Sequence, residues 1–356
     1  MIKILVVDDS ALVRKLLGQI FSTQDDFQVA FARNAKEALD SIAAAVPDVV
    51  TLDVHMPDMD GLQCLDRIMI EHPCPVIMVS SMTADGADAT LEALRLGAVD
   101  FVAKPTGAVS LKMDALAPEL VSKARQAAGA KLRTSLRLRE RIRHKSAGLR
   151  SALPRKAAAL KLQPAAGEGL VLVGTSTGGP PALEALLVPL PSSFPWPIVV
   201  AQHMPATFTG SLARRLDRIC SLTVNEVVAA TALKPGHVYI ARGDADIIVS
   251  KRKGGLVALP APAEAGYPWH PSTDRLVRSA LNHVDAGQLV GVLMTGMGDD
   301  GAQAMTVLNS NGGRTIAEAE ETAVVWGMPG ELVKAGGADF VLPLPDIAAQ
   351  LRKLVP

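Results

Sequence analysis

Short runs of valine, isoleucine and leucine alternate with amphipathic stretches over the first hundred residues of the chain. The apolar runs cover residues 4–7, 49–52, 76–79 and 101–103, and helical spacing marks residues 11–21, 35–45, 62–70, 89–96 and 116–128. Strand-like runs that alternate with helical segments are typical of βα units on a parallel sheet. The pattern therefore predicts an α/β fold for this part of the chain.

A second alternation begins after residue 169. Apolar runs at residues 170–173, 198–201, 238–241, 247–250 and 289–294 predict a second α/β sheet, doubly wound and mostly parallel, with helices between several of its strands. The sequence between the two patterns is rich in arginine, lysine, alanine and serine and ends in a stretch with Gln, Pro, Ala and Gly, which is linker composition. We therefore expect a first domain at 1–128, a basic linker at 129–168 and a second domain at 169–356.

Charge follows the same division. The 356 residues hold 36 basic and 36 acidic side chains, but residues 1–106 carry a net −8, residues 107–169 a net +10 and residues 170–356 a net −2. Such segregation indicates modular organisation. The basic stretch is compatible with a nucleic-acid arm, although a solvated or acid-facing connector is the commoner case, and no helix-turn-helix signature accompanies it. We expect no nucleic-acid partner.

Composition narrows the class of protein. Apolar residues make up 49% and charged residues 20% of the chain, and the longest apolar runs are far shorter than the ~20 residues that span a bilayer, so we expect a globular protein without membrane insertion. The first apolar run is followed by acids and not by a cleavage site. The three cysteines, Cys64, Cys74 and Cys220, have no zinc-like spacing. These features predict a cytoplasmic protein without disulfides.

Acidic residues gather at strand ends of the first domain. Asp8 and Asp9 follow the first apolar run and Asp53 follows the second, and in a parallel sheet these ends share one edge. Clustered carboxylates repel one another unless a cation is present, and oxygen ligands favour Mg²⁺. Lys104 and Ser80 would bring an ammonium and a hydroxyl to the same edge. These groups predict a site at which Asp53 accepts a phosphoryl group.

With these residues in place, positions 1–128 resemble a response-regulator receiver domain. The resemblance implies a flavodoxin-like fold with a parallel five-stranded sheet. It also implies phosphorylation at Asp53 and Mg²⁺ held by Asp8 or Asp9 with Asp53 and the backbone carbonyl of His55, whose side chain we expect to be exposed. The switch residues implied are Ser80, Phe101 and Lys104. The resemblance is carried by Asp8-Asp9, the block 52–61, Ser80 and the run 101–105.

The second domain places a nucleophile, a base and an acid after apolar runs. Ser176 lies in a G-x-S-x-G turn, a weak signal alone because glycine-rich turns also bind phosphate. His203 follows the run 198–201, and Asp299 and Asp300 follow the run 289–294. A serine nucleophile needs an imidazole to take its proton, and the imidazole needs a carboxylate to orient it. Spacing leaves the choice between the two aspartates open.

Other histidines are less well placed for this chemistry. His237 precedes its strand and should lie at the opposite sheet edge, whereas we expect His270 in a loop and His283 in a helix. The chain order Ser, His, Asp also disfavours an α/β-hydrolase, in which the order is Ser, Asp, His.

Residues 169–356 resemble the catalytic domain of the chemotaxis protein-glutamate methylesterases, the CheB family, through the blocks 174–180, 202–205, 235–241 and 295–301. The resemblance implies Asp300 as the triad acid, the backbone N–H of Met297 as an oxyanion donor, and no cofactor in the esterase site. One departure is the segment 267–272, Tyr-Pro-Trp-His-Pro-Ser, where the family commonly has a basic residue before Pro-Ser. This departure bears on the contacts with the receptor and not on the triad.

Together the two resemblances imply an enzyme that hydrolyses glutamate γ-methyl esters on methyl-accepting chemotaxis receptors and also deamidates receptor glutamines. They further imply a chemotaxis histidine kinase as phosphoryl donor, and a receiver that covers the serine cleft until it is phosphorylated. Two alternatives remain open from the residues: the same esterase in a non-chemotaxis receptor array, or a response regulator with a DNA-binding or scaffold output.

Overall fold

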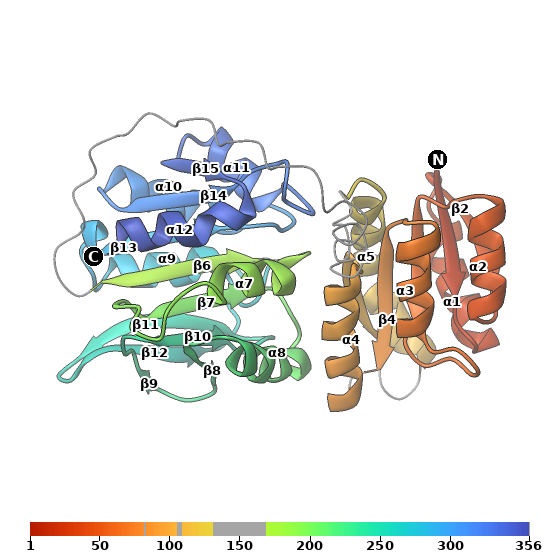
Figure 1. The fold of residues 1–356 in the computed structure, drawn as a ribbon, viewed down its shortest axis with the longest axis horizontal. Coiled ribbons are helices and arrows are strands. Elements are labelled where there is room, and N and C mark those ends of the chain that lie inside the picture. Colours follow the sequence, from red (N-terminus) through yellow and green to blue (C-terminus); the bar gives the residue numbers. More distant parts are fainter. Residues whose placement is uncertain (82, 105–108, 131–168, 356) are drawn as a thin grey trace, which may run out of the picture.

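The computed structural model describes residues 1–81, 83–104, 109–130 and 169–355. Two α/β units succeed one another along the chain and lie against each other (Figure 1). The predicted linker, 129–168, lies outside the described residues except for Gly129 and Ala130. The predicted fold class is confirmed for both units.

The first unit is a five-stranded parallel sheet in the order β2-β1-β3-β4-β5. All five residues of β3 are buried because helices cover both faces of the sheet, which explains why its strands form continuous apolar runs. The edge strand β2 was not predicted, because only its first and last residues are buried. The elements are β1 (Ile2–Val7), α1 (Ala11–Ser22), β2 (Phe27–Ala32), α2 (Ala35–Ala44), β3 (Val49–Asp53), α3 (Gly61–Glu71), β4 (Val76–Ser81), α4 (Ala84–Leu96), β5 (Asp100–Lys104) and α5 (Val109–Ala128).

The second unit is built on a seven-stranded parallel sheet in the order β15-β14-β13-β6-β7-β10-β8. Helices α7, α8 and α12 contribute to the core on one face, and α9, α10 and α11 to the core on the other. The elements of the large sheet and its helices are β6 (Leu170–Thr175), α7 (Gly179–Leu187), β7 (Ile198–Gln202), α8 (Ala206–Ile219), β8 (Thr223–Val227), β10 (His237–Ala241), α9 (Thr273–Leu281), η1 (Ala286–Gln288), β13 (Leu289–Leu293), α10 (Ala302–Ser310), β14 (Arg314–Glu318), α11 (Met328–Lys334), β15 (Phe340–Leu342) and α12 (Leu344–Leu354).

One predicted strand belongs to a different sheet. Residues 247–250 lie in β11 (Asp246–Arg252), which pairs antiparallel with β12 (Gly255–Ala261), and β12 pairs with the short β9 (Thr231–Ala232). This three-stranded sheet packs through β11 against α9. Periodicity reports that a strand is buried and not which strand it pairs with, so the assignment of 247–250 to the large sheet was wrong.

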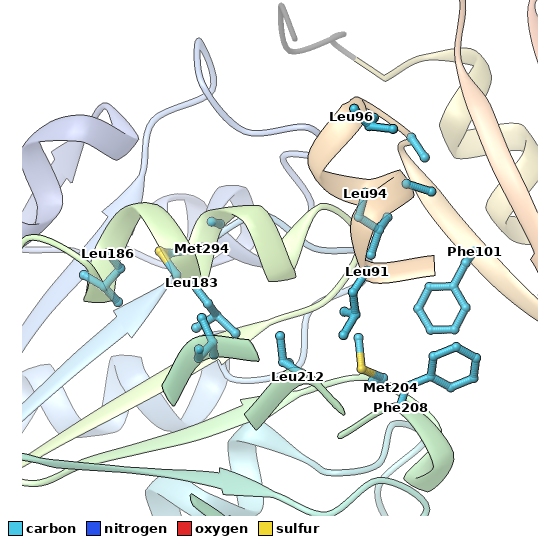
Figure 2. Close-up of a cluster of buried hydrophobic side chains, with 14 of the residues drawn as sticks. Leu91, Leu94, Leu96, Phe101, Leu183, Leu186, Met204, Phe208, Leu212 and Met294 are labelled. Carbon is cyan, nitrogen blue, oxygen red and sulfur yellow. The ribbon is translucent and has the colours of Figure 1, made fainter. Parts of the chain in front are cut away.

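The two units share an apolar interface. Helix α4 of the first unit packs on α8 and α7 of the second, and the side chains between them belong to one continuous buried cluster. In Figure 2, Leu91 and Phe101 face Met204, Phe208 and Leu212. The rings of Phe101 and Phe208 lie 4.4 Å apart between centroids.

Polar contacts border this apolar cluster. Arg215 of α8 forms an ion pair with Glu184 of α7 at 2.6 Å and with Glu92 of α4 at 3.3 Å, so one guanidinium links both units. On the other side, Val324 of the second unit belongs to a buried cluster with Leu120 and Val121 of α5. The first unit therefore contacts the second through α4, β5 and α5.

Replacing Leu91 by aspartate tests whether this interface holds the units together. Leu91 is 2% exposed, and an unpaired carboxylate there costs several kcal/mol. We expect Leu91→Asp to raise the radius of gyration in small-angle X-ray scattering while the far-ultraviolet circular dichroism stays that of the wild type. Asp88→Asn, at an exposed position of the same helix, is the matched control. An unchanged radius in a folded Leu91→Asp protein would contradict the interface.

Candidate functional site

Ser176 lies in a tight turn between β6 and α7. Gly178 has φ +74°, a left-handed conformation that glycine adopts without strain. A Cβ on Gly179 would lie 1.9 Å from Oε1 of Gln202, so only glycine fits there. The backbone N–H of Ser176 donates to the carbonyl of Thr295 at 3.0 Å. These constraints hold Ser176 at the carboxyl end of its strand.

His203 follows β7, the strand next to β6, and its main chain is tied to that of Ser176. The N–H of His203 donates to the carbonyl of Thr175 at 3.0 Å. The side-chain amide of Gln202 donates to the carbonyls of both Ser176 and His203, each at 3.0 Å, and its oxygen accepts from the Thr175 hydroxyl at 2.6 Å. Gln202 thus connects the two strand ends, a role that sequence reasoning did not assign.

Asp300 receives hydrogen bonds from the start of α9 as well as from the imidazole. Nε2 of His203 lies 2.7 Å from its Oδ2. The Ser272 hydroxyl donates to Oδ1 at 2.9 Å, and the backbone N–H groups of Thr273 and Asp274 donate at 2.6 and 3.0 Å. A helix N-terminus stabilises negative charge, so the carboxylate is well placed to remain ionised.

The environment of Asp300 decides which imidazole nitrogen carries the proton. Burial would raise the pKa of Asp300, but the hydrogen bonds from His203, Asp274 and Thr273 outweigh burial and lower the pKa. Because an ionised carboxylate only accepts hydrogen bonds, Nε2 of His203 must donate. Nδ1 of His203 is buried and has no hydrogen-bond partner in the described part of the chain. It is therefore the nitrogen that remains to accept a proton.

The structure places the predicted triad residues as follows. His203 and Asp300 are in direct contact, and the side-chain amide of Gln202 links the carbonyl of Ser176 to that of His203. Among the contacts of the described residues, none joins the Ser176 hydroxyl to the imidazole, which is common before substrate binds. Asp299, which spacing could not separate from Asp300, is exposed.

A second carboxylate supports the start of α9. Asp246 is 1% exposed and accepts from the backbone N–H of Ser272 at 2.7 Å, from Nδ1 of His270 at 3.0 Å and from Arg275 at 2.6 Å. His270 was expected only as a loop histidine. Ser272 was visible as an N-cap residue type before a helix, but neither it nor Asp246 could be linked to Asp300 from spacing.

The remaining histidines lie away from these groups. His237 is the first residue of β10, at the opposite edge of the sheet, as expected. His283 lies in the turn that follows α9 and not within the helix.

Met297 lies in the loop after β13, where Glu318 accepts the N–H of Thr295 at 2.8 Å and Gly296 accepts the N–H of Met328 at 2.9 Å. In the residues that the structure describes, no acceptor takes the backbone N–H of Met297. Its sulfur contacts the Ser122 hydroxyl at 3.7 Å and the Gln126 amide, both on α5.

The first unit also reaches the residue after Ser176. The hydroxyl of Thr177 donates to the carboxylate of Asp100, which is the first residue of β5. Lys123 of α5 donates to the carbonyl of Phe101 at 2.7 Å and lies 3.4 Å from Asp100. Both flanks of the serine site, Thr177 and Met297, are therefore in contact with the first unit.

The acidic cluster of the first unit forms as predicted at the carboxyl ends of adjacent strands. Asp8, Asp9 and Asp53 each place a carboxylate oxygen within 4.8 Å of the others. Nζ of Lys104 lies 2.8 Å from Asp8 and 2.7 Å from Asp53. Burial raises the pKa of Asp53, and the nearby Lys104 opposes that shift only in part. The set of oxygen donors fits Mg²⁺, the cation that such ligands prefer.

The other predicted receiver residues lie around this cluster. Ser80 is buried and its hydroxyl donates to the carbonyl of Gly86 at 3.1 Å. The side chain of His55 is exposed, as expected, and its N–H donates to Asp53 at 3.3 Å. Phe101 is 4% exposed and packs on Phe208 of the second unit, a contact that could not be seen in the sequence.

Comparisons with known proteins agree with both halves of this description. The family model described as CheB methylesterase matches residues 171–351, and the one described as response regulator receiver domain matches residues 4–115. A Rhodopseudomonas palustris protein named protein-glutamate methylesterase/protein-glutamine glutaminase 2 is 59% identical, with 98% of this chain and 97% of the relative covered. A Rhodospirillum rubrum protein named protein-glutamate methylesterase/protein-glutamine glutaminase 3 is 50% identical, with 99% and 96% covered.

A solved structure matches the second unit. The crystal structure of the Thermotoga maritima CheB methylesterase catalytic domain is 39% identical, with a TM-score of 0.51, and the match covers 53% of this chain and 100% of that chain. No helix in the described ranges has the length and apolar composition needed to cross a membrane.

The lowered pKa of Asp300 predicts a pH-dependent contribution to stability. A carboxyl whose folded-state pKa lies below its unfolded value of about 3.9 stabilises the fold above that pH, and this stabilisation is lost as the pH falls through the folded-state pKa. We expect the difference in free energy of unfolding between wild type and Asp300→Asn to be largest near neutral pH and to shrink below about pH 4. Urea denaturation over a pH series measures it. Asp299→Asn, at the exposed neighbour, is the matched control, and a pH-independent difference for Asp300→Asn would contradict the assignment.

Proposed function

Because this chain belongs to the CheB methylesterase family and combines its methylesterase domain with a receiver domain, we propose that it hydrolyses glutamate γ-methyl esters on methyl-accepting chemotaxis receptors and deamidates receptor glutamines. The observation that carries the proposal is the bond from Nε2 of His203 to the ionised Asp300, which leaves the buried Nδ1 unpartnered in a histidine that Gln202 links to Ser176.

Acylation follows from these positions. The Ser176 oxygen attacks the ester carbonyl while its proton passes to Nδ1 of His203, and Asp300 stabilises the imidazolium through Nε2–H. The negative charge on the former carbonyl oxygen is stabilised by the backbone N–H of Met297. As the tetrahedral intermediate collapses, the imidazolium returns the proton to the departing methoxide, and methanol leaves an acyl-enzyme at Ser176.

Deacylation uses the same groups in reverse. Nδ1 of His203 takes a proton from water as the water attacks the acyl carbon, and the proton then returns to the Ser176 oxygen as the free glutamate leaves. A side-chain amide presents the same carbonyl carbon, with ammonia in place of methanol as the leaving group. The relatives' names, which include protein-glutamine glutaminase, support this second activity.

We assign the receiver domain an inhibitory role in its docked position. Thr177 and Met297 flank Ser176, and both contact the receiver domain, through Asp100 and through α5. A receptor helix is about 10 Å wide and needs open space above the serine. Hydrolysis therefore requires a state in which the receiver domain has moved away, and a phosphoryl group on Asp53 would raise the population of that state.

Phe101 provides the connection between the two sites. It lies on β5, three residues before Lys104, and Lys104 bridges Asp8 and Asp53. Phosphorylation of Asp53 would draw Lys104 and the Ser80 hydroxyl to the phosphoryl oxygens, which shifts β4 and β5 beneath the Phe101–Phe208 contact. The interface thus depends on the charge state of the acidic cluster.

Mg²⁺ would be held by the carboxylates of Asp8, Asp9 and Asp53, with the carbonyl of His55 as a further ligand. When bound, it offsets the negative charge that a phosphoryl donor brings to a carboxylate.

The proposal also includes a chemotaxis histidine kinase as phosphoryl donor, a cytoplasmic location, and the division of the chain into domains at 1–128 and 169–356 with a basic linker at 129–168.

Replacing Ser176 by alanine tests the nucleophile. We expect Ser176→Ala to lower methanol release from methylated receptors, and ammonia release from receptor glutamine, by more than about a thousandfold while the melting temperature stays unchanged. Ser193→Ala, at an exposed serine of the same domain, is the control. Wild-type methanol release from the Ser176→Ala protein would refute the mechanism.

Replacing Asp53 by asparagine tests the regulation. A small phosphoryl donor should raise the methanol release of the wild type but not of Asp53→Asn, and chelation of Mg²⁺ should abolish the rise without changing the unphosphorylated rate. Asp58→Asn is the control, since Asp58 is exposed with φ 66°, a conformation that asparagine tolerates. Equal activation of the Asp53→Asn protein would exclude Asp53 as the acceptor.

A further inference from the structure

The imidazole of His203 is stacked on the indole of Trp269. The ring centroids lie 5.6 Å apart and the planes differ by 9°. The His203 side chain is 8% exposed and Trp269 is half-buried, so the indole covers one face of the base. The mechanism described above uses the two edges of the imidazole and assigns nothing to this face.

The same indole lies against the loop that carries the oxyanion donor. A Cβ on Gly298 would lie 3.3 to 3.5 Å from three indole atoms, so the ring occupies the space beside Gly298 in which a larger residue would place its side chain. Gly298 has φ +78° and directly follows Met297. Trp269 therefore lies beside both the base and the neighbour of the oxyanion donor.

A hydrogen bond at one nitrogen does not define the orientation of an imidazole. The terminal torsion of histidine is broad, and the ring can turn about the Nε2–Asp300 contact unless something sets its plane. A stacked aromatic face sets that plane and so sets the direction of Nδ1. The position of Trp269 is itself determined, because His270 bonds to Asp246 and Ser272 bonds to Asp300.

Trp269 also lines a cavity. The cavity has a volume of about 500 Å³ and its walls include Asp299 and Asp300, whereas His203 is not among them. A smaller side chain at position 269 would enlarge this cavity on the side where the indole is stacked on the imidazole, whose Nδ1 is buried and unpartnered.

We propose that Trp269 is a positioning residue of the esterase site, which holds the His203 imidazole in the plane that directs Nδ1 toward Ser176. The indole also fixes the position of the imidazole relative to the loop that carries Met297. This role rests on the proposed function. The indole lies beside His203 and beside Gly298, so it acts through the base and through the loop that carries Met297.

The kinetic test compares three replacements in the full-length protein, with methanol release from methylated receptors under phosphoryl donor. Trp269→Phe keeps a flat ring and should keep kcat within about threefold, whereas Trp269→Ala and Trp269→Leu should lower kcat about tenfold or more with KM within about twofold. Leucine fills the space without a flat ring, so it keeps the test valid if the alanine variant does not fold. Gln303→Ala, at an exposed position in the wall of the same pocket, should change kcat by less than about twofold.

A spectroscopic test reports the contact without any substrate. The emission of an indole depends on the groups packed against it, so we expect His203→Gln to change the emission spectrum of the full-length protein. The change should be absent when the same replacement is made in Trp269→Phe, which retains Trp196 and Trp326. A change of equal size in both backgrounds would overturn the contact.

The outcomes separate this role from the proposed function. If Ser176→Ala releases methanol at the wild-type rate, the esterase mechanism itself fails. If Ser176→Ala is inactive, three results would show that the positioning role alone is wrong. Trp269→Leu could keep the wild-type kcat, it could lose activity only through a higher KM, or Trp269→Phe could lose as much kcat as Trp269→Leu.

Discussion

The ionised, buried carboxylate of Asp300 is the constraint on which the catalytic half of this molecule depends. A carboxylate that is 5% exposed is tolerated only when its oxygens are satisfied, and here the first turn of α9, the Ser272 hydroxyl and the imidazole satisfy them. Because the carboxylate cannot donate, the imidazole must donate through Nε2, and this leaves Nδ1 as the nitrogen that can accept a proton. The tautomer of the base is thus a consequence of where a helix begins. The buried Asp246 accepts the backbone N–H of Ser272 and so fixes the start of the helix that holds Asp300.

A second constraint comes from the position of the receiver domain. Its contact with the catalytic domain combines an apolar centre with a bordering ion pair, and it reaches both residues that flank the nucleophile. In the proposed regulation a docked and an open state compete, and a shift from 1:99 to 99:1 would require about 5.5 kcal/mol of differential stabilisation. A phosphoryl group on Asp53 would supply part of it through the few residues between Asp53 and Phe101. The carboxyl ends of the catalytic sheet point toward the receiver domain in Figure 1, so the proposed open state would expose that edge.

Much of the fold could be predicted from the sequence because both sheets have helices on each face. Strands such as β3 and β6 are buried on both sides and form continuous apolar runs. Prediction failed where burial is partial. The edge strands β2 and β8 have only two buried residues each, and the short edge strand β15 has none. The strand at residues 247–250 was recognised but assigned to the wrong sheet, since burial does not specify a pairing partner. The family inferred from the motif blocks is confirmed by the comparisons.

By itself, the sequence determined the order of the two domains, the strand ends at which the serine, the histidine and the two neighbouring aspartates lie, and the acidic cluster around Asp53. These features are local, because each depends on a strand run and the few residues after it. Only the tertiary structure decided that Asp300 and not Asp299 meets the imidazole, that Nδ1 is the nitrogen left free, that Trp269 covers the ring and that Phe101 meets Phe208. Each of those contacts joins side chains far apart along the chain, and their meeting depends on how helices and domains pack, which no spacing of residue types encodes.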